Sequence, residues 1–212
     1  MNIIAETADY LVCVKPAGFL SQKGEGANMI DALGETQGEV FPVHRLDRET
    51  SGVMVFAKNS RAAALLSAQI TGGGMQKRYY AVTKAGLTPQ SGEMKDLLFR
   101  DMRNNKTFVV TRKRRGVKEA SLEYSLVCEK DGFALWDILL HTGRSHQIRA
   151  QFASRGYPLA GDRRYGGEKS EGLGLFAHSL SFTDPEKGEK LVFEQKPDTG
   201  TSPFNIFGEC FL

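Results

Sequence analysis

Short apolar runs that end in turn residues recur along the chain and predict a strand-rich protein. Tyr10–Val14 is an apolar run that ends at Pro16-Ala17-Gly18, and Val53–Ala57 is a second run that follows Ser51-Gly52. Runs of this length, bounded by proline and glycine, are typical of buried strands. Four further segments predict strands, namely residues 79–83, 107–111, 121–127 and 134–140.

Two segments have the spacing of apolar residues that predicts a helix. Ser60 is a candidate N-cap for a helix that Gly72 would end. A second helix is predicted from about Ser145 to Ser154, with Gly156 as its C-terminal cap. Because strands outnumber helices and the two do not alternate regularly, the predicted fold class is α+β, built on a mostly antiparallel sheet.

Composition indicates a folded globular protein. Hydrophobic residues make up 41% of the 212 residues and charged residues 25%, which fits a single domain over residues 1–212. No apolar stretch is long enough to cross a bilayer, and the acidic N-terminus differs from a secretory signal. Three scattered cysteines, Cys13, Cys128 and Cys210, predict neither a disulfide framework nor a metal site and suit a reducing cytoplasm.

Positive charge is concentrated in one segment. The net charge is +3, but Arg100 to Lys118 holds eight basic residues and one acid, Asp101, so this segment carries +7 and the rest of the chain −4. Asn104-Asn105 is a candidate hairpin turn that would present the segment outward. A basic segment on a mildly acidic body is typical of a phosphate-binding surface, and a solvated loop is the alternative interpretation.

Cofactor and metal motifs are missing from the sequence. There is no glycine-rich loop that ends in Gly-Lys-Ser/Thr, no complete dinucleotide fingerprint, no His-Glu-x-x-His and no Cys-x-x-Cys. The four histidines do not have the spacing of metal ligands. We therefore expect no cofactor and no metal, and a chemistry carried out by side chains alone.

The stretch His44-Arg45-Leu46-Asp47, followed by Thr50-Ser51-Gly52, contains the leading catalytic candidate. Asp47 lies between two arginines, and nearby positive charge favours the ionised carboxylate. A carboxylate on a loop that enters a strand can act as a nucleophile or a base. One alternative is a structural aspartate that accepts from the backbone of Thr50 and Ser51. A hydrolase triad of His44, Asp47 and Ser51 is disfavoured by its short spacing and by the lack of a Gly-x-Ser-x-Gly elbow.

Two further stretches carry side chains suited to a nucleic-acid site. Consecutive tyrosines in Lys77-Arg78-Tyr79-Tyr80 would point to opposite faces of a strand, so one can pack in the core while the other stacks on an extruded base. In Thr142–Arg149, Arg144 falls at the predicted helix start and could bind a carboxylate bidentately, whereas His146 fits polar packing. Asp162 is the other carboxylate in comparably polar surroundings.

In this order and spacing, the three stretches resemble the RluA family of RNA pseudouridine synthases. The Asp47 stretch matches that family's catalytic motif, Lys77-Arg78-Tyr79 its tyrosine motif and Thr142–Arg149 its arginine motif. Agreement extends from Lys15-Pro16-Ala17-Gly18 to Phe176-Ala177-His178, with a departure at Gln151, where a histidine is common. The N-terminal S4-like domain that many relatives carry has no counterpart in this sequence.

The resemblance implies a fold and a reaction. The fold would be the α+β pseudouridine synthase fold, a mostly antiparallel mixed sheet with flanking helices and loops around a central cleft. The reaction would detach uracil from ribose, turn the base and rejoin it through carbon, without a cofactor. Asp47 would start at the sugar, either by attacking it or by taking a sugar proton. Arg144 would pair with Asp47, and Tyr79 would stack on the flipped uracil.

The resemblance also implies contacts with RNA. Arg45 would enter the gap left by the flipped nucleotide, and the basic segment would grip phosphates without reading sequence. The other expected substrate contacts are His44, Thr50, Arg100, Arg103, Lys106, Arg112, Arg114 and Arg149.

The implied partner is a stem-loop of large-subunit ribosomal RNA, of transfer RNA, or of both, and neither DNA nor a membrane is expected. We expect a monomer in the cytoplasm. Two other function classes stay open at this point. An RNA-binding protein without turnover would not need Asp47, Tyr79 and Arg144 together, and an N-glycosidase would release free uracil.

Overall fold

The structure is a computed structural model that describes residues 1–211, and the chain divides into two compact units. The first unit comprises Met1–Lys77 and Phe176–Pro197, and the second comprises Arg78–Leu175 and the chain from Asp198 onward. The expectation of one catalytic domain over residues 1–212 stays a prediction. Within the described residues, no helix combines the length and the apolar character needed to cross a membrane.

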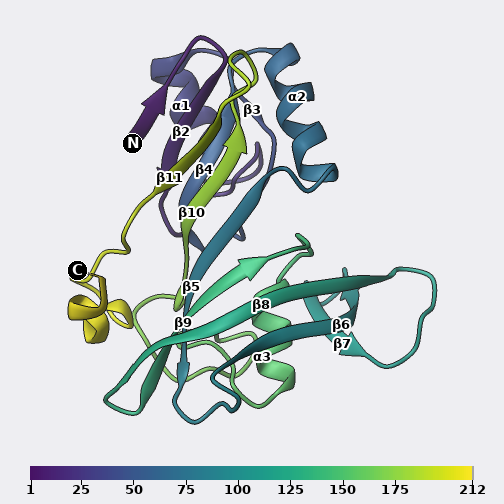
Figure 1. The fold of residues 1–212 in the computed structure, drawn as a ribbon, viewed down its shortest axis with the longest axis vertical. Helices are drawn as coiled ribbons and strands as arrows, with labels where there is room; N and C mark the ends of the chain where they lie inside the picture. Colours follow the sequence, from purple (N-terminus) through teal and green to yellow (C-terminus); the bar gives the residue numbers. More distant parts are fainter. Residues whose placement is uncertain (212) are drawn as a thin grey trace. The chain divides into compact units, whose positions relative to one another are not determined.

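The first unit is a mixed sheet with two helices (Figure 1). Its strands pair in the order β1-β2-β4-β10-β11, with β3 also paired to β4. β10 runs parallel to β4, and the other pairs are antiparallel. The elements of this unit are β1 (Asn2–Glu6), β2 (Tyr10–Lys15), α1 (Met29–Gln37), β3 (Phe41–Pro42), β4 (Ser51–Ala57), α2 (Ser60–Thr71), β10 (Leu175–Thr183) and β11 (Lys190–Glu194).

The centre of this sheet is apolar on both faces, which explains the uninterrupted apolar runs in the sequence. Val12 of β2 and Val55 of β4 are registered opposite one another and are fully buried. The entry of β4 depends on Gly52, which has φ +129° and is paired with Ala177 of β10. A Cβ atom at this position would clash with the backbone N and O atoms of Ala177, so glycine permits the close parallel approach.

The second unit is an antiparallel sheet whose strands follow in the order β5-β9-β8-β6-β7 (Figure 1). β8 pairs with β9 on one side and with β6 on the other, and β7 lies at the edge beside β6. The elements of this unit are β5 (Gln76–Lys84), β6 (Ser91–Asp101), β7 (Lys106–Val110), β8 (Val117–Lys130), β9 (Phe133–Leu140), α3 (Gln147–Ser154) and the 3₁₀ segment η1 (Phe204–Phe211), which is kinked at Phe207.

An aromatic cluster joins α3 to the sheet of the second unit. The rings of Tyr124, Trp136 and Phe152 lie with their centroids 5.6 to 6.1 Å apart, in edge-on or tilted contact. Trp136 is fully buried, and its Nε1 donates to Thr83 Oγ1 at 2.8 Å, so the one polar atom of the indole is satisfied.

The α+β prediction is confirmed, and all six predicted strands are present with shifted ends. The N-cap of α2 is Asn59, whose side chain accepts from Ala62 N at 2.8 Å, and not Ser60 as predicted. The helix predicted from Ser145 begins at Gln147, because His146 has a left-handed φ of 52°. The sequence pattern did not predict α1, which buries only Met29 and Leu33.

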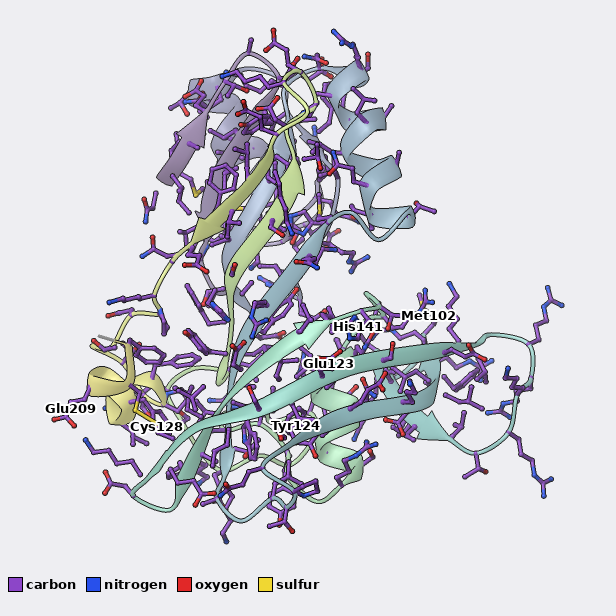
Figure 2. All side chains as sticks on the ribbon, in the orientation of Figure 1. Met102, Glu123, Tyr124, Cys128, His141 and Glu209 are labelled. Carbon is purple, nitrogen blue, oxygen red and sulfur yellow. A yellow bond between two sulfur atoms is a disulfide. The ribbon has the colours of Figure 1, made fainter. Side chains whose placement is uncertain are left out.

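The expectation that the cysteines form no disulfide is wrong for two of them. Cys128 of β8 and Cys210 of η1 form a disulfide across a sequence separation of 82 residues (Figure 2). The fold brings η1 back onto β8, so residues far apart in sequence become neighbours. Cys13 is a buried free thiol, and its burial raises its pKa to about 12. Cysteine usage therefore gives no support for a reducing compartment.

Candidate active site

The loop that carries Asp47 is anchored through its main chain on both sides of that residue. Before Asp47, Ser21 holds Leu46: the Ser21 hydroxyl donates to Leu46 O, and Leu46 N donates to Ser21 Oγ, both at 2.9 Å. After Asp47, Gly18 N donates to Arg48 O at 2.8 Å, and Arg48 Nε donates to Gly18 O at 2.9 Å. These reciprocal bonds restrict the backbone on either side of Asp47.

A buried lysine completes this anchoring. Lys15, the last residue of β2, is fully buried, and its Nζ donates to the carbonyl oxygens of Pro16, Phe19 and Arg48 at 2.9, 2.8 and 3.1 Å. Each ammonium hydrogen thus has an acceptor. Burial lowers the pKa of Lys15 to about 8, while attraction to Asp47 works in the opposite direction. Through its bond to Arg48 O, the ammonium ion places a positive charge in contact with the loop that carries Asp47.

Sequence reasoning missed Lys15 and Ser21 as parts of this site. Lys15 was noted only in the resemblance to known relatives. The available signal was a charged residue at the end of an otherwise buried apolar run, since such a residue is rarely buried without a dedicated set of partners.

His44 precedes the loop and is held in its neutral form. Its Nε2 accepts from Val55 N of β4 at 3.1 Å, so the neutral ring carries its proton on Nδ1. Burial, with the charge of Lys77 as a smaller cause, lowers the pKa of His44 to about 3. Among the described residues, His44 Nδ1 and the hydroxyl of Thr50 are buried polar atoms that have no hydrogen-bond partner. Two expected substrate contacts therefore carry a buried polar atom whose hydrogen-bonding capacity is unused among the described residues.

The structural-aspartate interpretation predicted that the Asp47 carboxylate binds backbone donors in a tight turn. In the structure the N–H of Thr50 donates to the main-chain oxygen of Asp47 at 3.1 Å. The turn is thus closed by the backbone of Asp47. Asp47 as a residue is half-buried, whereas Arg45 is exposed.

The two tyrosines of β5 have different surroundings. Tyr79 is buried, with 6% of its surface exposed. Tyr80 packs on Phe211 of η1, with a centroid separation of 5.1 Å. Tyr79 and Arg144 belong to the second unit, and Asp47 belongs to the first.

The two arginines of the third motif differ sharply. Arg144 is exposed, and its Nε donates to Glu119 O at 3.0 Å. Arg149 of α3 is 3% exposed and forms a bidentate pair with Asp162, Nε to Oδ2 at 2.7 Å and Nη2 to Oδ1 at 2.8 Å. Asp162 Oδ1 also accepts from Arg164 N and Tyr165 N at 3.2 Å, which fits a structural carboxylate.

Tyr165 connects this motif to the basic hairpin. Its hydroxyl accepts from Thr107 N at 2.8 Å, donates to Thr107 O at 3.0 Å and lies 3.1 Å from His146 Nδ1. Lys106 Nζ and the Arg149 guanidinium lie 4.9 and 5.3 Å from the centroid of the Tyr165 ring. The start of β7 is therefore fixed to the loop before α3.

The predicted basic hairpin is present, but the basic segment is divided between two loops. The first is the β6–β7 turn at residues 102–105, where Asp101 Oδ1 accepts from Arg103 N at 2.9 Å and from Asn104 N at 3.2 Å. Arg100 bonds to Asn105 across this turn. The second is the exposed loop between β7 and β8, which holds Arg112, Lys113, Arg114 and Arg115.

No group of three or more histidine, cysteine, aspartate or glutamate side chains in residues 1–211 is arranged to hold a metal ion. The ammonium of the buried Lys15 bonds to the residue after Asp47, and His44 and Thr50, three residues away on either side, contribute a neutral imidazole and a buried hydroxyl.

Comparison with known proteins identifies the family. Residues 9–154 match the family model of RNA pseudouridylate synthase. The chain is 36% identical to an RNA pseudouridine synthase of Aquifex aeolicus, over 99% of this chain and 73% of that protein. It is 32% identical to the dual-specificity RNA pseudouridine synthase RluA of Vibrio parahaemolyticus, over 87% of this chain and 78% of the relative.

A solved structure shares the fold. The human RNA pseudouridylate synthase domain-containing protein 4 matches with a TM-score of 0.78 and 22% identity, over 93% of this chain and 88% of that one. The pseudouridine synthase fold expected from the sequence is therefore confirmed. The family match, the two relatives and this fold agree with one another. The chain belongs to the RluA family of RNA pseudouridine synthases, isomerases that convert uridine to pseudouridine in RNA.

Proposed function

We propose that this protein isomerises selected uridines in large-subunit ribosomal RNA, in transfer RNA, or in both, with Asp47 as the catalytic aspartate and without a cofactor. Relatives at about this level of identity include the Vibrio RluA, named for dual specificity, and a ribosomal large subunit pseudouridine synthase D of Neisseria meningitidis at 32% identity, of which this chain spans 57%. We expect the enzyme to work as a cytoplasmic monomer on a stem-loop.

One observation carries the assignment of Asp47. Its loop is fixed at Leu46 by Ser21 and at Arg48 by the buried Lys15. A residue that must attack a ribose or take its proton needs a defined position, and main-chain anchors on both sides provide it. The ammonium of Lys15 favours the ionised carboxylate that either route requires.

Two arginines are candidates for the electrostatic partner of the Asp47 carboxylate. The sequence motif suggests Arg144, which is exposed and bonded to a main-chain oxygen. Arg149 is buried and oriented by Asp162, as expected for a preorganised electrostatic partner. We therefore extend the proposal to include Arg149. Tritium release by the single variants Arg144→Ala and Arg149→Ala decides which of the two arginines supports Asp47.

The remaining roles concern the substrate. Tyr79 stacks on the flipped uracil, and Arg45 enters the gap that the nucleotide leaves. His44 and Thr50 are the further substrate contacts that the family resemblance implies, and each has one buried polar atom without a hydrogen-bond partner among the described residues. The cations of the two basic loops bind phosphates and position the RNA.

The test is release of tritium from RNA that carries the label at carbon 5 of uridine, since this hydrogen leaves when the base rejoins through carbon 5. Purified protein without added cofactor or metal is incubated separately with bulk transfer RNA and with large-subunit ribosomal RNA transcripts. We expect release from at least one RNA, complete loss in Asp47→Ala and retention in Glu49→Gln, a matched exposed carboxylate of the same loop.

Three outcomes contradict the proposal. Turnover by a folded Asp47→Ala protein would remove Asp47 from the mechanism and make Asp162 the next candidate. Free uracil among the products would indicate an N-glycosidase. Tight RNA binding without turnover on either RNA would indicate an RNA-binding protein.

A further inference from the structure

The β6–β7–β8 part of the second unit has two faces of different character. Leu98 and Ala120 point to the face that α3 covers and pack with Ala150 of that helix. Val109 of β7 packs on the same cluster, and Thr107, two residues earlier, is buried with its hydroxyl donating to Ser145 O at 2.8 Å, so both belong to the covered face. Because side chains alternate along a strand, their neighbours in sequence lie on the opposite face.

That opposite face carries a row of apolar side chains. Phe99 of β6 is registered directly opposite Phe108 of β7 and Val117 of β8, so the three share one face and adjoin one another. Phe108 is 42% exposed, and Phe99 and Val117 are partly buried. Among the described residues, neither Phe99 nor Phe108 forms a ring contact with another aromatic side chain.

Two cations lie near the rings of this row. The guanidinium carbon of Arg114 is 4.6 Å from the centroid of Phe99. Nζ of Lys106 is 5.5 Å from the centroid of Phe108 and 4.9 Å from that of Tyr165, so it lies between the two rings. Both cations belong to the basic segment, and neither has an ion-pair partner among the described residues. The face therefore combines aromatic rings with unneutralised positive charge.

We propose that this face, made of Phe99, Phe108, Val117, Lys106 and Arg114, binds an unpaired nucleotide of the substrate RNA by stacking its base on Phe108. The inference rests on the proposed function for its RNA substrate and adds a contact that lies outside the isomerised uridine. The proposed contact is separate from Arg149 of the arginine motif, because Arg149 belongs to α3, which packs on the opposite face of these strands.

The chemistry of the face selects RNA as its occupant. An exposed ring on a sheet gives a base a flat apolar surface, as in other single-strand-binding sheets, and flanking cations neutralise the phosphates on either side of that base. A paired base cannot use such a surface, because its faces are already stacked within the helix. The proposed ligand is therefore a loop or bulge nucleotide rather than a duplex.

Affinity measurements test the stacking directly. Phe108→Leu keeps an apolar side chain and removes the ring, and Phe108→Trp keeps a ring. For an oligonucleotide with an unpaired loop, we expect Phe108→Leu to raise Kd about tenfold and Phe108→Trp to leave it within about twofold. The control is Val127→Ala, which alters a different apolar side chain, located in β8 and 40% exposed.

Salt dependence separates the ring from the cations. Phe108→Leu should leave the slope of log Kd against log salt unchanged, because the ring carries no charge. Arg114→Ala should weaken binding and reduce the slope by about 0.7. A wild-type Kd for Phe108→Leu, or equal loss in Val127→Ala, would overturn the proposal.

Fluorescence provides a second readout. The single native tryptophan, Trp136, is fully buried, so in Phe108→Trp the RNA-dependent change reports on position 108. We expect quenching by the unpaired-loop RNA and none by a blunt duplex. Quenching by neither RNA would contradict the proposal.

Kinetics distinguishes this inference from the proposed function. If wild-type protein forms no pseudouridine, the proposed function fails, whereas stacking is still decided by Kd and fluorescence. If the wild type is active, Phe108→Leu should raise KM and leave kcat within about twofold, since Phe108 does not contact the isomerised base. A dimer in solution that dissociates in Phe108→Leu, with unchanged RNA affinity, would show that this face binds a second copy instead.

Discussion

The ammonium group of Lys15 lies 3.1 Å from the main-chain oxygen of Arg48, the residue that follows Asp47, and Lys15 is fully buried. A lysine from the end of β2 thus fixes the loop that carries the proposed catalytic aspartate. The cost of burying the ammonium is offset by three carbonyl acceptors, two of which belong to the turn after β2. This contact ties the position of Asp47 to the rigid sheet of the first unit.

Replacing Lys15 by methionine keeps most of the volume and removes every donor. We expect Lys15→Met to lower the free energy of unfolding by about 2 kcal/mol, because three carbonyl oxygens lose their partner. Turnover at saturating RNA should fall as well, since the Asp47 loop loses one of its anchors. Urea unfolding and tritium release measure the two effects, and unchanged values for both would refute the positioning role.

The pH dependence of stability tests the charge of Lys15. Its pKa is about 8 in the folded protein and about 10.5 in the unfolded chain, so between these values the unfolded state binds more protons. Stability contributed by this group therefore rises as pH increases from 8 and is lost as pH falls through 8. The wild type should gain stability relative to Lys15→Met between pH 7.5 and 9.5.

His44 should show the same direction of pH dependence as Lys15, but at acid pH. Burial lowers its pKa to about 3, below the ordinary value of 6.5, so the stability it contributes is present above pH 6.5 and lost as pH falls toward 3. His44→Gln, which retains an acceptor for Val55 N, should lack this dependence. Between pH 7 and 4.5 the wild type should lose about 2 kcal/mol relative to His44→Gln in urea unfolding. Parallel loss in both proteins would show that His44 does not titrate in this way.

The two arginines of the third motif should differ in stability. Arg149→Ala leaves the buried carboxylate of Asp162 without its cation, and we expect it to destabilise the protein by about 3 kcal/mol. Arg144→Ala removes an exposed side chain and should change stability by less than about 0.5 kcal/mol. Thermal unfolding measures both. Arg149→Lys, which preserves the charge but not the bidentate geometry, should fall between them.

The Cys128–Cys210 disulfide should make stability depend on reductant. Cross-linking residues 82 positions apart restricts the unfolded chain, and we expect its reduction to cost about 3 kcal/mol. The melting temperature of the wild type should fall when a phosphine reductant is added, whereas that of Cys210→Ser should not change. Mass measurement of the alkylated protein, with and without reduction, shows directly whether the two thiols are joined.

The loop between β7 and β8 should contribute affinity without specificity. Replacing Arg112, Lys113, Arg114 and Arg115 by glutamine should weaken binding to all RNAs and flatten the salt dependence of Kd. The exposed Lys113 is already paired with Glu119, so its share should be the smallest. If Kd, measured at several salt concentrations, and the slope of log Kd against log salt were both unchanged, the loop would be a solvated surface loop that does not bind RNA.

Local sequence patterns were sufficient to predict many of the strands and to identify the family. The apolar runs of β2 and β4 identified central strands, because strands covered on both faces need continuous apolar sequence. The motif around Asp47 and the basic segment were visible as well, since both are contiguous in sequence. The reaction class followed from these motifs by resemblance, and the family comparison supports it.

Other features depended on contacts between distant residues, which no local pattern encodes. The Lys15–Arg48 bond, the Arg149–Asp162 pair and the Cys128–Cys210 disulfide each join segments that only the folded chain brings together. Burial separated Arg149 from Arg144, which look alike in the motif. Sequence by itself determined the class of chemistry, because that depends on which residues are present. Tertiary structure decided which of them are held in place, because positioning depends on neighbours far along the chain.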